Sequence, residues 1–125
     1  MAKKFLIDTN VLIKYLNGSL DQNLASLIDN INIEISIITK IEILSWSGFS
    51  EFQKNQILIF LSKCRMFSVE DEIIETVVGF RNKYKLKIPD AIIAATAFYN
   101  NMQLVTLDKD FANIKGLRII SSIEI

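Results

Sequence analysis

The sequence predicts an α/β fold built around a mainly parallel sheet. Short β-branched or aliphatic runs alternate with longer segments that carry apolar residues at helical spacing, and strands that alternate with helices usually pair in parallel. The chain has 125 residues, of which 50% are hydrophobic, with one Pro and four Gly. A chain of this length and composition forms one ordered core rather than two. We therefore expect a single domain over residues 1–125.

The first half of the chain is expected to hold two strands and four helices. KFLI suits a short buried strand, and Asn17-Gly18 is a typical helix end. INIEISI is β-branched and alternates, as strands do. The elements expected here are a strand over 4–7, helices over 10–17 and 20–30, a strand over 31–37, and helices over 39–46 and 51–62.

The second half is expected to add three strands and two helices. Ile88-Pro89-Asp90 opens a helix, because Pro is favoured in a first turn, and the following AIIAATAFY is apolar nearly all round. That helix should be buried. The other elements expected here are a strand over 65–69, an amphipathic helix over 70–85, and strands over 103–107 and 117–122 separated by the turn-like DKDFANIKG.

The composition excludes several classes of enzyme. The chain has no histidine, which rules out Ser-His-Asp and Cys-His catalysis and His-ligated zinc. Fourteen basic and fourteen acidic residues cancel, which argues against binding nucleic acid through bulk positive charge. Cys64 is the only cysteine and has no partner for an internal disulfide. No apolar run is long enough for a signal peptide or a membrane helix, so we expect a cytoplasmic protein.

Five acidic residues are expected at one edge of the sheet. In open α/β sheets the reactive crevice lies outside the carboxyl ends of the strands. Asp8 follows the first expected strand, and Asp108 and Asp110 follow the fourth. Asp90 stands at the start of the buried helix, and Glu42 lies near the start of the helix that follows the second strand. These elements should therefore bring their carboxylates toward the same edge.

Each acid also has an ordinary structural interpretation. These are helix capping for Asp8, Thr9 or Asn10, dipole complementation for Asp90, a turn for Asp108 and Asp110, and an ion pair with Lys40 or another surface cation for Glu42. Clustered carboxylates, however, repel one another unless a cation offsets them. A hard divalent ion bound through carboxylates and water is the natural compensation. Taken together, the acids predict a metal site.

Four segments carry these acids in order: LIDTNVLI around Asp8, SIITKIEIL around Glu42, KIPDAIIAATA around Asp90 and LVTLDKDF around Asp108. Together they resemble the PIN-domain ribonucleases, and specifically the small VapC-like toxins of type II toxin–antitoxin systems. Each segment alone is weakly specific, but the ordered set covers nearly the whole chain. The resemblance implies a three-layer α/β/α sandwich with a mainly parallel central sheet.

The resemblance also implies Mg²⁺- or Mn²⁺-dependent cleavage of RNA by water activated at the metal. Asp8 and Asp90 would be direct ligands, Asp108 would complete the metal site, and Glu42 would bind metal or orient the attacking water. Many relatives carry Asn at the position of Asp108, so Asp110 is a candidate substitute or helper. Thr106 and Asn10 match polar residues that the family places beside its site.

Partners follow from the same resemblance. It implies a cognate VapB-like antitoxin and a homodimer of the toxin. The aromatic and aliphatic residues of 43–60 are expected to be core in part and an antitoxin groove in part; they include Trp46, Phe49, Phe52, Ile57 and Phe60.

An acidic site repels RNA, so cations must hold the phosphates. RNKYKLK places basic residues with no acid among them just before Asp90, although cations at a helix end favour the dipole whatever the function. The RNA-binding candidates are Arg81, Lys83, Lys85 and Lys87, with Lys14 and Lys109 near the other acids.

Two other functions remain open from the sequence. A haloacid dehalogenase-type phosphatase also has an acid after its first strand, but it uses D-x-D, and here the third position is Asn10. That alternative also leaves KIPDAIIAATA unexplained. A degenerate, non-catalytic PIN-fold binding module is the second alternative, and the intact acids speak against it.

Overall fold

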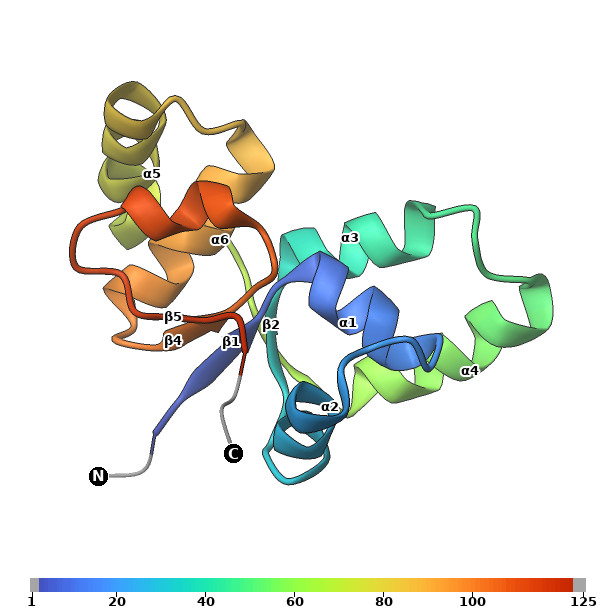
Figure 1. The fold of residues 1–125 in the computed structure, drawn as a ribbon. Helices are drawn as coiled ribbons and strands as arrows, with labels where there is room; N and C mark the ends of the chain where they lie inside the picture. The colour runs from blue at the N-terminus through green and yellow to red at the C-terminus, as the bar shows by residue number, and fades with distance from the viewer. Residues whose placement is uncertain (1–2, 123–125) are drawn as a thin grey trace.

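Five parallel strands form the central sheet of the computed structural model, which describes residues 3–122 (Figure 1). The strand order is β3-β2-β1-β4-β5. The elements are β1 (Phe5–Ile7), α1 (Thr9–Leu16), α2 (Gln22–Asp29), β2 (Glu34–Ser36), α3 (Ile37–Ser45), α4 (Glu51–Ser62), β3 (Arg65–Phe67), α5 (Asp71–Tyr84), α6 (Ile88–Tyr99), β4 (Gln103–Val105), the 3₁₀ helix η1 (Lys109–Asn113) and β5 (Ile119–Ile120). The predicted α/β class with a parallel sheet is confirmed.

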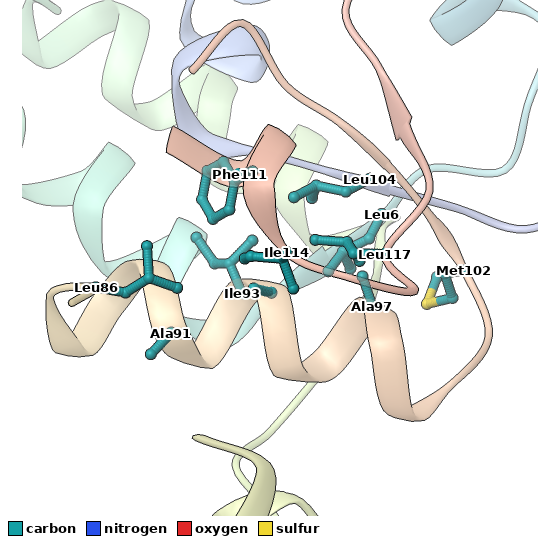
Figure 2. Close-up of a cluster of buried hydrophobic side chains, with 11 residues drawn as sticks. Leu6, Leu86, Ala91, Ile93, Ala97, Met102, Leu104, Phe111, Ile114 and Leu117 are labelled. Carbon is teal, nitrogen blue, oxygen red and sulfur yellow. The ribbon is translucent and has the colours of Figure 1, made fainter. Parts of the chain in front are cut away.

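Helices cover both faces of the sheet, as a three-layer sandwich requires. Successive residues of a strand point to opposite faces. Leu6 of β1 accordingly packs into a cluster with α6 and η1, whereas Ile7 packs into a second cluster with α1 to α4. Figure 2 shows the first cluster, in which Phe111 of η1 lies over the α6 side chains.

Several elements differ from the sequence-based expectation, either at their ends or in type. The second strand is limited to Glu34–Ser36, the residues in register with β3. Helix α3 starts at Ile37 rather than Thr39, because the Ser36 hydroxyl accepts a hydrogen bond from the Ile38 N–H and caps the helix there. The segment expected to be a turn forms η1, which buries Phe111 completely.

The topology puts a crevice between β1 and β4. From β1 the chain adds β2 and β3 on one side, and β4 and β5 then fill the other side of β1. Such a reversal of strand order opens the crevice where α/β proteins bind ligands, at the carboxyl ends of the strands. Among the described residues, no helix is both long and apolar enough to span a bilayer.

Candidate active site

Asp8 is held at the end of β1 by hydrogen bonds from three directions. Its backbone N–H donates to the Val105 carbonyl across the β1–β4 crevice at 2.9 Å. Oδ1 accepts from the Thr9 N–H at 2.8 Å, and Oδ2 accepts from the Thr106 hydroxyl at 2.7 Å. Asp8 itself is thus the N-cap of α1, rather than Thr9 or Asn10. Since each carboxylate oxygen has two lone pairs, both oxygens keep one for a ligand.

Asp8 carries an electrostatic cost in this position. Its side chain is buried, and its pKa is raised from 3.8 to about 6, mainly by burial. The charges of Asp90 and Asp108 contribute to this rise, whereas the hydrogen bonds from Thr106 and Thr9 act against it. A carboxylate that is costly to ionise favours a nearby cation, as predicted for a metal ligand.

Thr106 links Asp8 to the next two acids. Its hydroxyl donates to Asp8 and accepts from the Asp108 N–H at 3.0 Å. The Asp108 carboxylate in turn accepts from the Asp110 N–H at 2.9 Å and caps η1. Asp108 is partly buried and Asp110 is exposed. The start of η1 is therefore oriented by a hydrogen-bond chain that begins at Asp8.

Two buried threonines orient Glu42. The Thr9 hydroxyl donates to Glu42 Oε1 at 2.7 Å and lies 2.9 Å from the Thr39 hydroxyl. Because Thr9 has one hydroxyl proton, Thr39 must donate to Thr9. Neither Thr9 nor Thr39 was predicted from the sequence to be a site residue. The available signal was a hydroxyl next to Asp8 and another one helical turn before Glu42. Among the described residues no ion pair joins Glu42 to Lys40.

Asp90 lies in the first turn of α6, close to the other acids. Burial raises its pKa, and the charges of Asp108, Glu42 and Asp110 raise it further, while Lys87 lowers it. The carboxylates predicted from four separate segments are therefore brought into one electrostatic cluster.

The carboxylates fit a hard metal ion in donor type. Carboxylate oxygens are the ligands that Mg²⁺ and Mn²⁺ prefer, and an ion would offset the repulsion that raises the pKa values of Asp8 and Asp90. Within residues 3–122, however, no three acidic side chains converge tightly enough to form a ready-made cage. The predicted metal site is thus an open group of acids, and its metal remains a prediction.

Two clefts flank the acids. One, of about 570 Å³, is lined by Asp90, Asp108 and Asp110 together with Lys83, Lys85 and Lys87. Lys85, which lines this cleft, is the residue that follows α5, and its φ of 59° places it in the left-handed conformation that ends the helix. The second cleft, of about 410 Å³, joins Asp108 to Asn10, Lys14 and Trp46.

The remaining two RNA-binding candidates lie outside these cleft walls. The Arg81 guanidinium donates from Nε to the Leu86 carbonyl at 3.3 Å, which ties the end of α5 to the following loop. Lys109 is exposed on η1, beside Asp108 and Asp110 in the chain. These positions leave the RNA-binding predictions untested.

Comparisons with known proteins identify the family. Residues 5–117 match the PIN domain. No curated protein matches this chain. Among solved structures, a toxin–antitoxin complex from Klebsiella pneumoniae has a chain with 32% identity and a TM-score of 0.79, covering 98% of this chain and 100% of that one.

Two further structures show the same fold. VapBC2 from Rickettsia felis, bound to a DNA fragment from its promoter, gives 25% identity and a TM-score of 0.76 over 93% of this chain and 96% of that one. DNA-bound VapBC from Salmonella typhimurium gives 21% identity and a TM-score of 0.81 over 95% and 98% of the two chains. The motif-based resemblance is confirmed, and the haloacid dehalogenase alternative is left without support. The chain belongs to the PIN-domain family.

Proposed function

We propose that this protein is a metal-dependent endoribonuclease that acts as the toxin of a toxin–antitoxin pair, as a single catalytic domain. The observation that carries the proposal is the convergence of Asp8, Asp90 and Asp108 at the β1–β4 crevice of a PIN domain, with Glu42 beside them. The likeness to chains of toxin–antitoxin complexes supports the biological role.

The acids divide the chemical work between them. Asp8, Asp90 and Asp108 would hold Mg²⁺ or Mn²⁺, which when bound would lower the pKa of water and stabilise charge on the scissile phosphate. Glu42 is fixed through Oε1 by Thr9, so its second oxygen is left to accept a proton from the attacking water. Thr106 keeps Asp8 oriented, and Asp110 keeps Asp108 oriented through its backbone N–H. Asn10 is a polar support in the first turn of α1.

Lysines next to the acids hold the RNA. Lys83, Lys85 and Lys87 line the same cleft as the acids, and their charges offset the repulsion between carboxylates and phosphates. Lys14 lines the second cleft, together with Asp108. Arg81 and Lys109 contribute long-range attraction only, because neither lines these clefts.

A VapB-like antitoxin is proposed to bind the groove between α1 and α4. Leu16, Phe49, Ile57 and Phe60 line this groove of about 240 Å³, together with Gln53 and Gln56. Phe49 and Ile57 are buried against the core, whereas Phe52 is 71% exposed. The region is thus core in part and contact surface in part. Homodimerisation and a cytoplasmic location stay predictions.

The test of this function is RNA cleavage by the purified chain. We expect cleavage with Mg²⁺ or Mn²⁺, its loss in excess chelator, and its return when the ion is added back. Asp90→Asn should lower the rate at least about a hundredfold, because it removes one carboxylate from the cluster. Cleavage that survives chelation or Asp90→Asn would contradict the proposal. Absent cleavage together with absent Mn²⁺ binding by calorimetry would favour the non-catalytic binding module.

Thr9→Val should lower the cleavage rate about 10- to 100-fold, the usual effect of losing a group that orients a site residue. Valine has the shape of threonine but cannot donate to Glu42 or accept from Thr39. The buried Thr39 hydroxyl then lacks its partner, which should cost about 1–3 kcal/mol of unfolding free energy. Thr9→Ser is the matched control and should retain most of the cleavage rate and most of the unfolding free energy. Equal cleavage rates for the two variants would show that Thr9 does not orient Glu42.

A further inference from the structure

We propose that the second cleft is a nucleobase subsite, in which Trp46 stacks against one base of the RNA beside the scissile phosphate. This inference rests on the proposed function and names part of its specificity. Trp46 ends α3, where its backbone N–H donates to the Ile43 carbonyl at 3.2 Å. Its side chain is 38% exposed and lines the cleft that also includes Asp108.

The indole of Trp46 is held in a fixed place. A Cβ on Gly48 would lie 2.1 Å from the indole Cη2, so the ring occupies the space that a side chain at Gly48 would take. On another side the Phe49 ring meets it edge-on, with centroids 4.8 Å apart and planes at 77°. An aromatic ring that is both exposed and immobilised loses little entropy when another ring stacks on it.

The rest of the cleft offers groups that suit the other parts of a nucleotide. Lys14 is exposed and can meet a phosphate. The Asn17 side-chain oxygen accepts from the Ser19 N–H at 3.0 Å and from its hydroxyl at 2.6 Å. Within the described part of the chain, the Asn17 amide NH₂ has no partner and can bind a base edge. The volume of about 410 Å³ is that of a small-ligand pocket.

A base fits this cleft better than an apolar side chain of a protein partner. Single-stranded RNA is recognised by stacking its bases on aromatic rings and binding their edges with polar groups, and the cleft has both. Asp108 belongs to both the cleft and the acidic cluster, so a base bound here has its phosphate close to the acids.

Trp46 is the only tryptophan, so its fluorescence reports directly on this subsite. The experiment titrates the protein in chelator with a short single-stranded RNA, and separately with an abasic strand of equal length and charge. We expect the RNA to quench Trp46 and the abasic strand to leave it nearly unchanged. Equal quenching by both strands, or none by either, would overturn the subsite.

Variants test the same point by anisotropy of labelled RNA. Trp46→Leu should weaken RNA binding at least about fivefold, the lower end of what one stacked base contributes, and leave abasic-strand binding unchanged. Trp46→Phe should retain much of the affinity, and Gly48→Ala should lower it by displacing the indole. Phe52→Leu, at another exposed aromatic outside the cleft, is the matched control.

The outcomes separate this inference from the proposed function. Base-dependent quenching without metal-dependent cleavage would leave the subsite standing and remove the nuclease. Metal-dependent cleavage with unchanged RNA affinity in Trp46→Leu would support the nuclease and overturn the subsite. Self-association or protein-partner binding that depends on Trp46, with RNA affinity unchanged, would assign the indole to a protein contact and overturn the subsite.

Discussion

Asp8→Asn is expected to abolish RNA cleavage while making the metal-free protein more stable. Asp8 is the acid most tightly fixed in the crevice, with hydrogen bonds to both carboxylate oxygens. Removing its charge removes a proposed metal ligand, and the metal would supply several kcal/mol of transition-state stabilisation, so the rate should fall about a thousandfold or more.

The gain in stability follows from the cost of ionising a buried acid. The pKa of Asp8 rises from 3.8 to about 6 on folding, and one pKa unit corresponds to 1.36 kcal/mol. Ionised Asp8 therefore destabilises the metal-free fold by about 3 kcal/mol at neutral pH, as an order of magnitude. Asparagine keeps the hydrogen bond from the Thr9 N–H, and its NH₂ can donate to the Thr106 hydroxyl, but the proton of that buried hydroxyl then loses its acceptor. The net gain should therefore be smaller than this figure.

The raised pKa of Asp8 also determines how the stability of the fold changes with pH. A carboxyl whose pKa is raised in the folded state binds more protons there than in the unfolded chain. Between about pH 4 and 6 the folded wild type should therefore gain stability as the pH falls. The advantage of Asp8→Asn should be full above about pH 6 and vanish below about pH 4. Denaturant unfolding in chelator measures it, and a variant that is less stable than wild type at pH 7.5 would contradict the burial argument.

Phe111→Ala should cause the largest loss of stability among these substitutions. Phe111 is completely buried, and its ring packs with Leu86 and Ile93 between η1 and α6 (Figure 2). Truncating a buried Phe to Ala costs about 3–5 kcal/mol, from lost transfer energy and the cavity that remains. A domain has only about 5–15 kcal/mol in total, so the melting temperature should fall on the order of 10–20 °C.

Cleavage should also fall in Phe111→Ala, even at temperatures where the protein remains folded. Phe111 anchors η1, whose first residues include Asp110 and follow directly on Asp108. Phe111→Leu should retain most of the stability because it leaves a much smaller cavity. Phe52→Ala, at a side chain that is 71% exposed, should change the unfolding free energy by less than about 0.5 kcal/mol. Calorimetric melting of the three variants would contradict this account if Phe111→Ala and Phe52→Ala lost equal stability.

Local sequence patterns were sufficient to predict the helices and strands and to assign the acidic residues to one edge of the sheet. Alternation and helical spacing are properties of neighbouring residues, so every expected helix and strand is present within a few residues. The parallel sheet was predicted from the alternation of strands with helices along the chain. Because parallel strands end at one edge, Asp8 and Asp108 could be assigned to a common crevice without knowing which strands pair.

The tertiary structure alone decided the partners of those acids. Nothing local indicates that β1 lies between β2 and β4, which is why the Asp8 N–H reaches Val105 and its carboxylate meets Thr106, 98 residues away. The same holds for Thr9, whose hydroxyl joins Thr39 to Glu42. It holds also for the indole of Trp46 over Gly48, because a rotamer depends on what fills the space around it.

Sequence by itself thus determined the fold class, the order of the elements and which residues are acidic at the crevice. The hydrogen bonds that orient each carboxylate, the raised pKa values and the shape of the clefts were decided only by the folded chain. The physical reason is range: secondary structure depends on residues a few positions apart, whereas burial and charge repulsion depend on every group that the fold brings near.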